Sequence, residues 1–186
     1  MIDIAAAVQR FFDRVADGSA EIYNEPSLQH ELGVFLRVEA AQPLKVQFER
    51  PVGYFGLSKS TFVKNEIDLA LFTADKSERA AIEVKFPRNG QYPEQMFSFC
   101  KDIAFVEQLV SAGFITGVFV VAVDDPRFYS GSQTGIYAPF RGGAPLHGRI
   151  NKPTGKKDET VEIVGSCRIR WYDAKVVKYA CVVATR

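Results

Sequence analysis

Long apolar runs are absent from this chain. None approaches the roughly 20 apolar residues that a transmembrane helix needs, so no membrane-spanning segment is expected. The first segment also lacks the basic stretch that opens a secretory signal peptide, and it carries Asp3 and Asp13. We therefore expect a cytoplasmic protein that has no membrane partner.

Cysteine and histidine are scarce. The three cysteines, Cys100, Cys167 and Cys181, are widely spaced and form no C-x-x-C pair, which argues against a disulfide framework or a zinc site. The two histidines, His30 and His147, are far apart, and the chain has neither a G-x-S-x-G motif nor a glycine-rich phosphate loop. Catalysis through a histidine-based nucleophilic triad thus lacks support.

Charge of one sign is not in large excess, but the net charge of +1 conceals an uneven distribution. Residues 147–186 hold nine of the 23 Lys and Arg and four of the 22 Asp and Glu, which leaves 14 and 18 for residues 1–146. An acidic region joined to a basic one suits a protein that holds a polyanion and keeps carboxylates free for a metal ion. Charge alone favours the simpler interpretation of a solvated basic hairpin.

The length of 186 residues suits one domain, 1–186, that can bury a substantial core. The apolar content of 47% is sufficient for such a core. Apolar periodicity and breaker residues predict its elements. These are helices 2–17, 24–40 and 93–112, strands 44–52, 66–73, 80–86 and 115–123, a long loop 124–159, and a C-terminal β-hairpin 161–184 that pairs 161–172 with 175–184. This order predicts an α/β fold, a mixed sheet flanked by helices.

Three charged residues lie inside apolar, β-branched runs that are typical of buried strands. Asp68 lies in NEIDLALF, and Glu83 and Lys85 lie in AAIEVKFP. Burying two acids and a lysine on neighbouring strands is costly unless a partner such as a divalent cation compensates their charge. A carboxylate pair beside a lysine is suited to metal-assisted cleavage of a phosphodiester.

Strand geometry gives these residues a common direction. Glu83 and Lys85 are two positions apart and therefore project from one face. If the neighbouring strand presents Asp68 on that face, both carboxylates can bind one Mg²⁺, or Mn²⁺ in its place. Lys85 would then orient or deprotonate a metal-bound water, or stabilise developing charge. The alternative is a structural Glu83–Lys85 salt bridge on an exposed edge strand.

Asp68 and, fifteen positions later, Glu83-Val84-Lys85 resemble the PD-(D/E)XK nuclease superfamily. The resemblance implies a restriction-endonuclease-like αβββαβ core, which the expected elements of residues 24–123 match in order. It also implies metal-dependent hydrolysis of phosphodiester bonds. Ile67 stands where the superfamily pattern has proline.

The same resemblance implies a fourth acid from the first core helix and a polar helper from the helix after the E-x-K strand. Glu31 and Glu25 are the two candidates for this acid and metal ligand. We expect Glu31, because the favourable position of an acid at a helix start already explains Glu25. Gln95 and Lys101 are the candidate helpers, and a solvated helix face is the simpler interpretation of both.

The resulting hypothesis is a metal-dependent nuclease, with DNA as the expected partner. The expected contacts to nucleic acid are Lys64, Arg88, Arg141, Arg149, Lys152, Lys156 and Lys157. Aromatic residues of the long loop would stack on bases or pack the loop down: Phe128, Tyr129, Tyr137 and Phe140. A catalytically silent nucleic-acid-binding or assembly module and an RNA-directed nuclease are the alternatives, and a homodimer is left open.

Overall fold

The computed structural model describes residues 2–40, 44–155 and 158–185. The helices are α1 (Ile4–Asp17), α2 (Glu25–Glu39), α3 (Tyr92–Ser111) and the short α4 (Tyr137–Arg141), with 3₁₀ turns η1 (Val52–Phe55), η2 (Lys59–Thr61) and η3 (Pro126–Phe128). The strands are β1 (Lys45–Pro51), β2 (Glu66–Phe72), β3 (Arg79–Lys85), β4 (Thr116–Val123), β5 (Leu146–Asn151), β6 (Thr160–Cys167), β7 (Tyr172–Asp173) and β8 (Lys178–Thr185).

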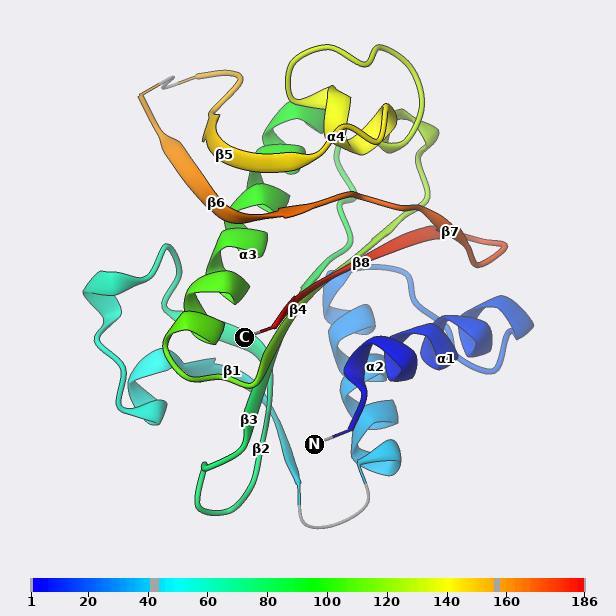
Figure 1. Ribbon diagram of the computed structural model, residues 1–186. Helices are drawn as coiled ribbons and strands as arrows, with labels where there is room; N and C mark the ends of the chain where they lie inside the picture. The colour runs from blue at the N-terminus through cyan, green and yellow to red at the C-terminus, as the bar shows by residue number, and fades with distance from the viewer. Residues whose placement is uncertain (1, 41–43, 156–157, 186) are drawn as a thin grey trace.

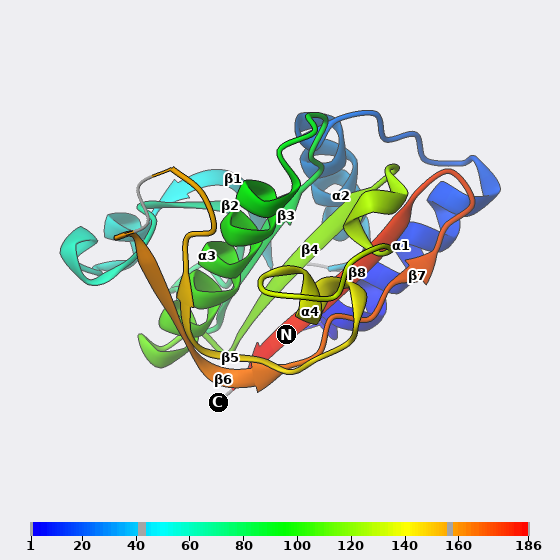
Figure 2. The same ribbon diagram turned by 90° about the horizontal axis from the view of Figure 1, so that it is seen from above.

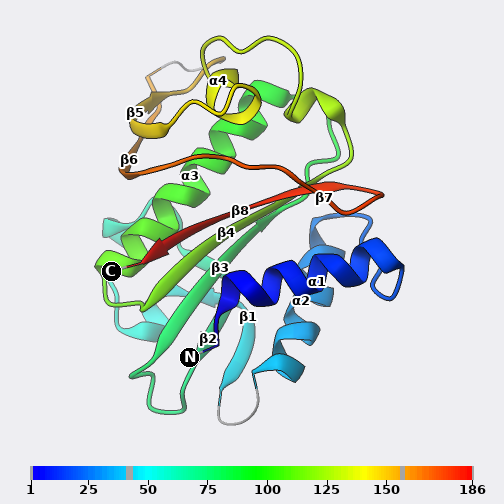
Figure 3. The same ribbon diagram turned by 45° about the vertical axis from the view of Figure 1, so that its right-hand side comes forward.

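Six strands form one mixed sheet in the order β1-β2-β3-β4-β8-β7. The β3–β4 pair is parallel, and the other neighbouring pairs are antiparallel. Helices α1 and α2 cover one face, and α3 covers the other (Figures 1 and 2). Figure 3 shows the twist of this sheet between the two helical layers. The prediction of an α/β fold with a mixed sheet flanked by helices is confirmed.

The first helical layer forms because each helix has a buried apolar stripe and defined ends. Asp3 caps the start of α1 by accepting a hydrogen bond from the Ala6 backbone amide, and Gly18 ends the helix in a left-handed conformation with φ 84°. Apolar side chains of α1 and α2 pack with those of the sheet in one core cluster. No helix in the described part of the chain is long and apolar enough to cross a membrane.

The second layer is built on α3, which packs closely on β4. A side-chain carbon added at Gly117 would lie 2.7 Å from the Val106 backbone oxygen, so the approach of helix to strand requires glycine there. Seven of the eight residues of β4 are buried, in agreement with the continuous apolar run that predicted a central strand. The separate β5–β6 sheet lies against α3 on its outer side.

The C-terminal third of the chain departs from the prediction. The segment 124–159 is not one long loop, because it contains η3, α4 and β5. The expected hairpin of 161–172 with 175–184 is also wrong: β6 pairs with β5, and β8 pairs with β4. Only Tyr172 and Asp173 pair with β8 as a hairpin would. An alternating strand pattern indicates a half-buried strand but does not choose its partner.

Candidate active site

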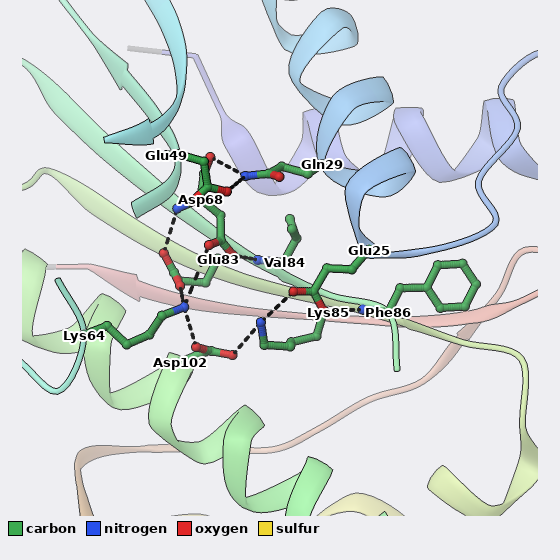
Figure 4. A network of polar contacts seen from close by, with 10 residues as sticks. All are labelled: Glu25, Gln29, Glu49, Lys64, Asp68, Glu83, Val84, Lys85, Phe86 and Asp102. Atoms are coloured by element: carbon green, nitrogen blue, oxygen red, sulfur yellow. Dashed lines mark hydrogen bonds and ion pairs between the residues drawn. The ribbon is translucent and has the colours of Figure 1, made fainter. Parts of the chain in front are cut away.

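The β2–β3 ladder opens at one end of the sheet, and two carboxylates replace its missing backbone bonds (Figure 4). Paired residues run from Phe72↔Arg79 to Leu69↔Ile82, where the ladder stops. Beyond it, the Asp68 backbone amide donates to Glu83 Oε1 at 3.1 Å. The Val84 backbone amide donates to Asp68 Oδ2 at 2.9 Å. Both acids are thereby held by the opposite strand.

The three residues predicted from the sequence point to the same side of the sheet. Asp68, Glu83 and Lys85 all face α3, whereas Ile82 and Val84 alternate with them into the core beneath α1 and α2. Glu83 is fully buried, and Asp68 and Lys85 are largely buried. The strand alternation therefore placed these side chains correctly.

A third carboxylate comes from α3 and was not singled out from the sequence. Asp102 is 2% exposed and faces the two lysines of the site. A signal for it existed, because Asp102 lies three positions from Phe99 and from Phe105, both fully buried. An acid inside the apolar stripe of a helix is costly to bury without a cation, and it therefore indicates a functional or paired position.

Lys64 occupies the centre of the cluster rather than the surrounding surface. Its ammonium contacts Glu83 Oε2, lies 2.9 Å from Asp102 Oδ1 and forms a longer ion pair with Asp68 Oδ1 at 3.8 Å. The sequence suggested Lys64 as a phosphate contact near the site. The geometry makes it instead an internal counter-ion for three acids.

Glu25 holds the other lysine. Its Oε1 atom lies 2.9 Å from Lys85 Nζ, and its Oε2 atom accepts a hydrogen bond from the Phe86 backbone amide at 3.3 Å. Asp102 Oδ2 forms a longer ion pair with Lys85 at 3.7 Å. The start of α2 thus reaches the end of β3, where it fixes the lysine of the E-x-K motif.

The expectation that Glu31 approaches the cluster while Glu25 stays in solvent is wrong. Gln29 of α2 donates to the Asp68 backbone oxygen at 2.8 Å, so its side of the helix faces β2. Glu25 lies one turn before Gln29 on the same side, whereas Glu31 lies roughly 200° around the helix from Gln29. Among the described residues, Glu31 makes no hydrogen bond or ion pair with Asp68 or Lys85.

Strain lies directly opposite Asp68. Glu49 of β1 has φ 50°, a left-handed conformation that is unusual for a non-glycine residue inside a strand. It interrupts the otherwise regular β1–β2 register between Phe48↔Leu69 and Arg50↔Ile67. Gln29 bonds both the Glu49 carboxylate and the Asp68 carbonyl oxygen, and so closes the gap.

Burial and mutual charge set the protonation of the cluster. Loss of solvent raises the pKa of Glu83 well above its ordinary value, and the neighbouring Asp68 adds to the effect. Burial also raises the pKa of Asp68 to about 6, against the opposing charge of Lys64. Burial lowers the pKa of a lysine, but the surrounding carboxylates outweigh it and raise the pKa of both Lys64 and Lys85. Both lysines are ammonium ions at neutral pH.

The two candidate helpers on α3 are engaged outside the cluster. Gln95 donates to the Asn89 side chain at 2.9 Å. Lys101 forms an ion pair with Glu159 at 2.9 Å, and Glu159 also binds Lys152 at 2.8 Å. The positions of Gln95 and Lys101 therefore agree better with a solvated helix face than with a catalytic role.

Most residues expected to contact nucleic acid already have protein partners. Arg88 pairs with Asp124, and Arg141 donates to backbone oxygens of its own loop. Arg149 is exposed on β5, whereas Lys156 and Lys157 lie outside the described residues.

The aromatic residues of the same loop divide into two groups. Phe128 and Phe140 are each 1% exposed and pack against Phe99, so they anchor the loop. Tyr129 and Tyr137 are half-buried and contact Lys178 and Arg141 respectively. Base stacking by Phe128 or Phe140 would require the loop to leave the core.

The donor chemistry suits a hard divalent cation. Asp68, Glu83 and Asp102 supply carboxylate oxygens, which Mg²⁺ and Mn²⁺ prefer. Asp102 Oδ2 is buried and accepts no hydrogen bond within the described part of the chain. As these side chains stand, no three acidic, histidine or cysteine residues among those described are arranged to hold a metal ion. The Lys64 ammonium lies between the carboxylates instead.

Comparison with known proteins identifies no relative. No family model, curated protein or solved structure matches this chain. The resemblance to the PD-(D/E)XK superfamily therefore stays a prediction.

Proposed function

We propose that this protein is a metal-dependent nuclease that hydrolyses phosphodiester bonds, with DNA as the expected substrate. The observation that carries the proposal is the convergence of Asp68, Glu83 and Lys85 at the open end of the β2–β3 ladder, on one face of the sheet. The order α2, β1, β2, β3, α3, β4 agrees with the αβββαβ order of restriction-endonuclease-like proteins.

The cost of the arrangement favours a function over a purely structural role. Glu83 and Asp102 are almost fully buried, and burial of a charged carboxylate gains no hydrophobic stabilisation. Replacing a buried ionic network by apolar residues of similar size is often neutral or stabilising. A fold that needed only stability would gain little from three acids at this place.

The residues take separate roles in the proposed reaction. Asp68 and Glu83 would hold Mg²⁺ or Mn²⁺, with Asp102 within reach of the same position. A bound divalent cation lowers the pKa of a coordinated water and neutralises charge on the phosphate. Lys85, held by Glu25, would orient the attacking water or stabilise charge on the phosphate oxygens as an ammonium donor.

A catalytically silent nucleic-acid-binding or assembly module is the competing function. The observation that favours it is the neutralisation of the acids by Lys64, which gives the cluster a self-contained structural explanation. An RNA-directed nuclease on the same fold is a further alternative, and the sequence has no motif that decides for or against recognition of a 2′-hydroxyl. Both alternatives make different predictions for cleavage.

The deciding experiment is a cleavage assay with purified protein. Linear, supercoiled, branched and single-stranded DNA and single-stranded RNA are each incubated with Mg²⁺, with Mn²⁺ or with EDTA. We expect cleavage of DNA that requires the divalent cation and is lost in Asp68→Asn and Glu83→Gln. Binding without cleavage under every metal would favour the silent module, and cleavage confined to RNA would reassign the substrate.

A further inference from the structure

Lys64 takes the position that a metal ion would need. Its ammonium touches Glu83 and Asp102 and pairs at longer range with Asp68, so one organic cation serves three acids from β2, β3 and α3. Figure 4 shows these three side chains pointing toward the Lys64 nitrogen. A divalent cation that bound the same oxygens would overlap with the ammonium.

The cluster keeps an excess of negative charge even with Lys64 in place. Four carboxylates, from Glu25, Asp68, Glu83 and Asp102, share two ammonium groups. When all four are ionised, two negative charges remain uncompensated. Replacing the single charge of Lys64 by the double charge of a metal ion would reduce that excess.

Asp102 gives independent support, because one of its buried carboxylate oxygens has no hydrogen-bond partner among the described residues. The side chain is 2% exposed, and its Oδ2 atom has no hydrogen-bond donor among the described residues. A buried carboxylate oxygen without a hydrogen bond loses solvation, and the Lys85 ammonium at 3.7 Å is too far from Oδ2 to replace that bond. Its partner Oδ1 faces Lys64, so the whole carboxylate is aimed into the cluster.

Lys64 has a route out of the cluster. It lies in the connection between η2 and β2, and its side chain is 25% exposed, more than Asp68 or Lys85. The backbone on either side is fixed, since Val63 donates to Gln108 and Asn65 accepts from Val52. Rotation of the flexible lysine side chain would release the ammonium to solvent without movement of this backbone.

We infer that Lys64 is a built-in competitor for the divalent cation, and that Asp102 is a third carboxylate ligand once Lys64 has swung out. The inference depends on the proposed metal-dependent function. It assigns Lys64 to competition with the metal ion and not to substrate contact.

The test measures metal binding directly, by titrating Mn²⁺ into the metal-free protein in a calorimeter and by thermal unfolding in EDTA and in Mn²⁺. Lys64→Met removes the competitor, and Lys59→Met, an exposed lysine on η2, is the matched control. We expect Lys64→Met to bind Mn²⁺ about tenfold more tightly than wild type and to gain more thermal stability from it. Lys59→Met should behave as wild type.

Asp102→Asn tests the ligand and covers the case in which Lys64→Met does not fold. This substitution keeps Lys64 paired with Glu83 but removes one negatively charged metal ligand, so the affinity for Mn²⁺ should fall about tenfold or more. Lys64→Met that is unfolded in EDTA and folded in Mn²⁺ would also support competition.

Two results would overturn the inference and can be told apart. If Mn²⁺ binds Lys64→Met and wild type equally and Asp102→Asn loses no affinity, competition is wrong and the proposed nuclease still stands. If neither wild type nor any variant binds Mn²⁺ or Mg²⁺, the inference and the proposed function both fail.

Discussion

Lys85 Nζ lies 2.9 Å from Glu25 Oε1, a contact between the end of β3 and the start of α2. These residues are 60 positions apart in the chain. The same glutamate accepts from the Phe86 backbone amide, so it fixes both the side chain and the strand end beside it. Glu25 is therefore a positioning residue for the lysine of the E-x-K motif.

Glu25→Gln should lower the turnover of the proposed nuclease about tenfold, because Lys85 loses the nearer of its two charged partners and keeps only the longer ion pair with Asp102. Substrate affinity should not fall, since Glu25 repels phosphate rather than binding it. Glu31→Gln, on the same helix but outside the cluster, is the matched control and should leave kcat unchanged. Steady-state kinetics of both variants, with thermal unfolding to confirm the fold, would check this. Equal effects of the two substitutions would refute the assignment.

Asp68→Asn and Glu83→Gln should each reduce divalent-dependent cleavage by about 100-fold or more, because each removes a charged metal ligand. Nucleic-acid binding should persist, since losing a carboxylate lessens repulsion of phosphate. Parallel cleavage and fluorescence-anisotropy measurements separate the two effects. A variant that loses binding together with cleavage would indicate misfolding or a different role for the acid.

Glu159→Gln should strengthen binding to nucleic acid. Glu159 holds Lys101 and Lys152 in ion pairs, and its removal would free both ammonium groups. If both then contact phosphate, the slope of log K against log salt should steepen by nearly two. Glu21→Gln, an exposed acid of the α1–α2 connection, makes the same change in net charge and should have a much smaller effect. Identical salt slopes for the two variants would count against a basic contact surface at this place.

Glu49→Gly and Glu49→Ala separate backbone strain from side-chain bonding. Both remove the bond from Gln29, but only glycine adopts φ 50° without penalty. The glycine variant should be more stable than the alanine variant by about 1 kcal/mol. Urea unfolding monitored by circular dichroism measures the difference, and the reverse order would show that the left-handed conformation is not strained.

The thiols should react slowly in the folded protein. Burial raises the pKa of Cys167 to about 11 and that of Cys181 to about 12, and it also raises the pKa of Cys100. At pH 8 the thiolate fraction of Cys167 would be about one in a thousand, compared with about one in ten for a thiol of pKa 9. Labelling with a thiol-specific disulfide reagent should thus be at least about 100-fold faster in urea. Rapid labelling of the native protein would show that a thiol is open to solvent.

The sequence predicts the central part of the fold well. Each strand of the β2–β3 hairpin is a short apolar run bounded by polar turns, and the parity of the strand residues places Asp68, Glu83 and Lys85 on a common face. The boundaries of α1 and α2 follow from Asp3, Gly18 and other local capping signals that act over a few residues.

The rest depends on contacts that local patterns do not encode. β6 pairs with β5 and packs on α3, and strand propensity does not encode this choice of partner over β8. Lys64 and Asp102 meet because a connection and a helix approach the same strand end, although 38 positions separate them. The choice between Glu25 and Glu31 depended on the rotation of α2 about its axis, which Gln29 reveals only in the folded protein.

The hydrogen bonds that close the open ladder also bear on which metal ion the site would accept. Asp68 uses Oδ2, and Glu83 uses Oε1, to bond a backbone amide, so each acid has one oxygen that is free of a backbone hydrogen bond. This arrangement favours monodentate ligation by both acids. Ca²⁺ takes six to eight oxygens and often bidentate carboxylates, whereas Mg²⁺ accepts a few monodentate oxygens and keeps several waters. The backbone of the sheet would in this way select the smaller ion.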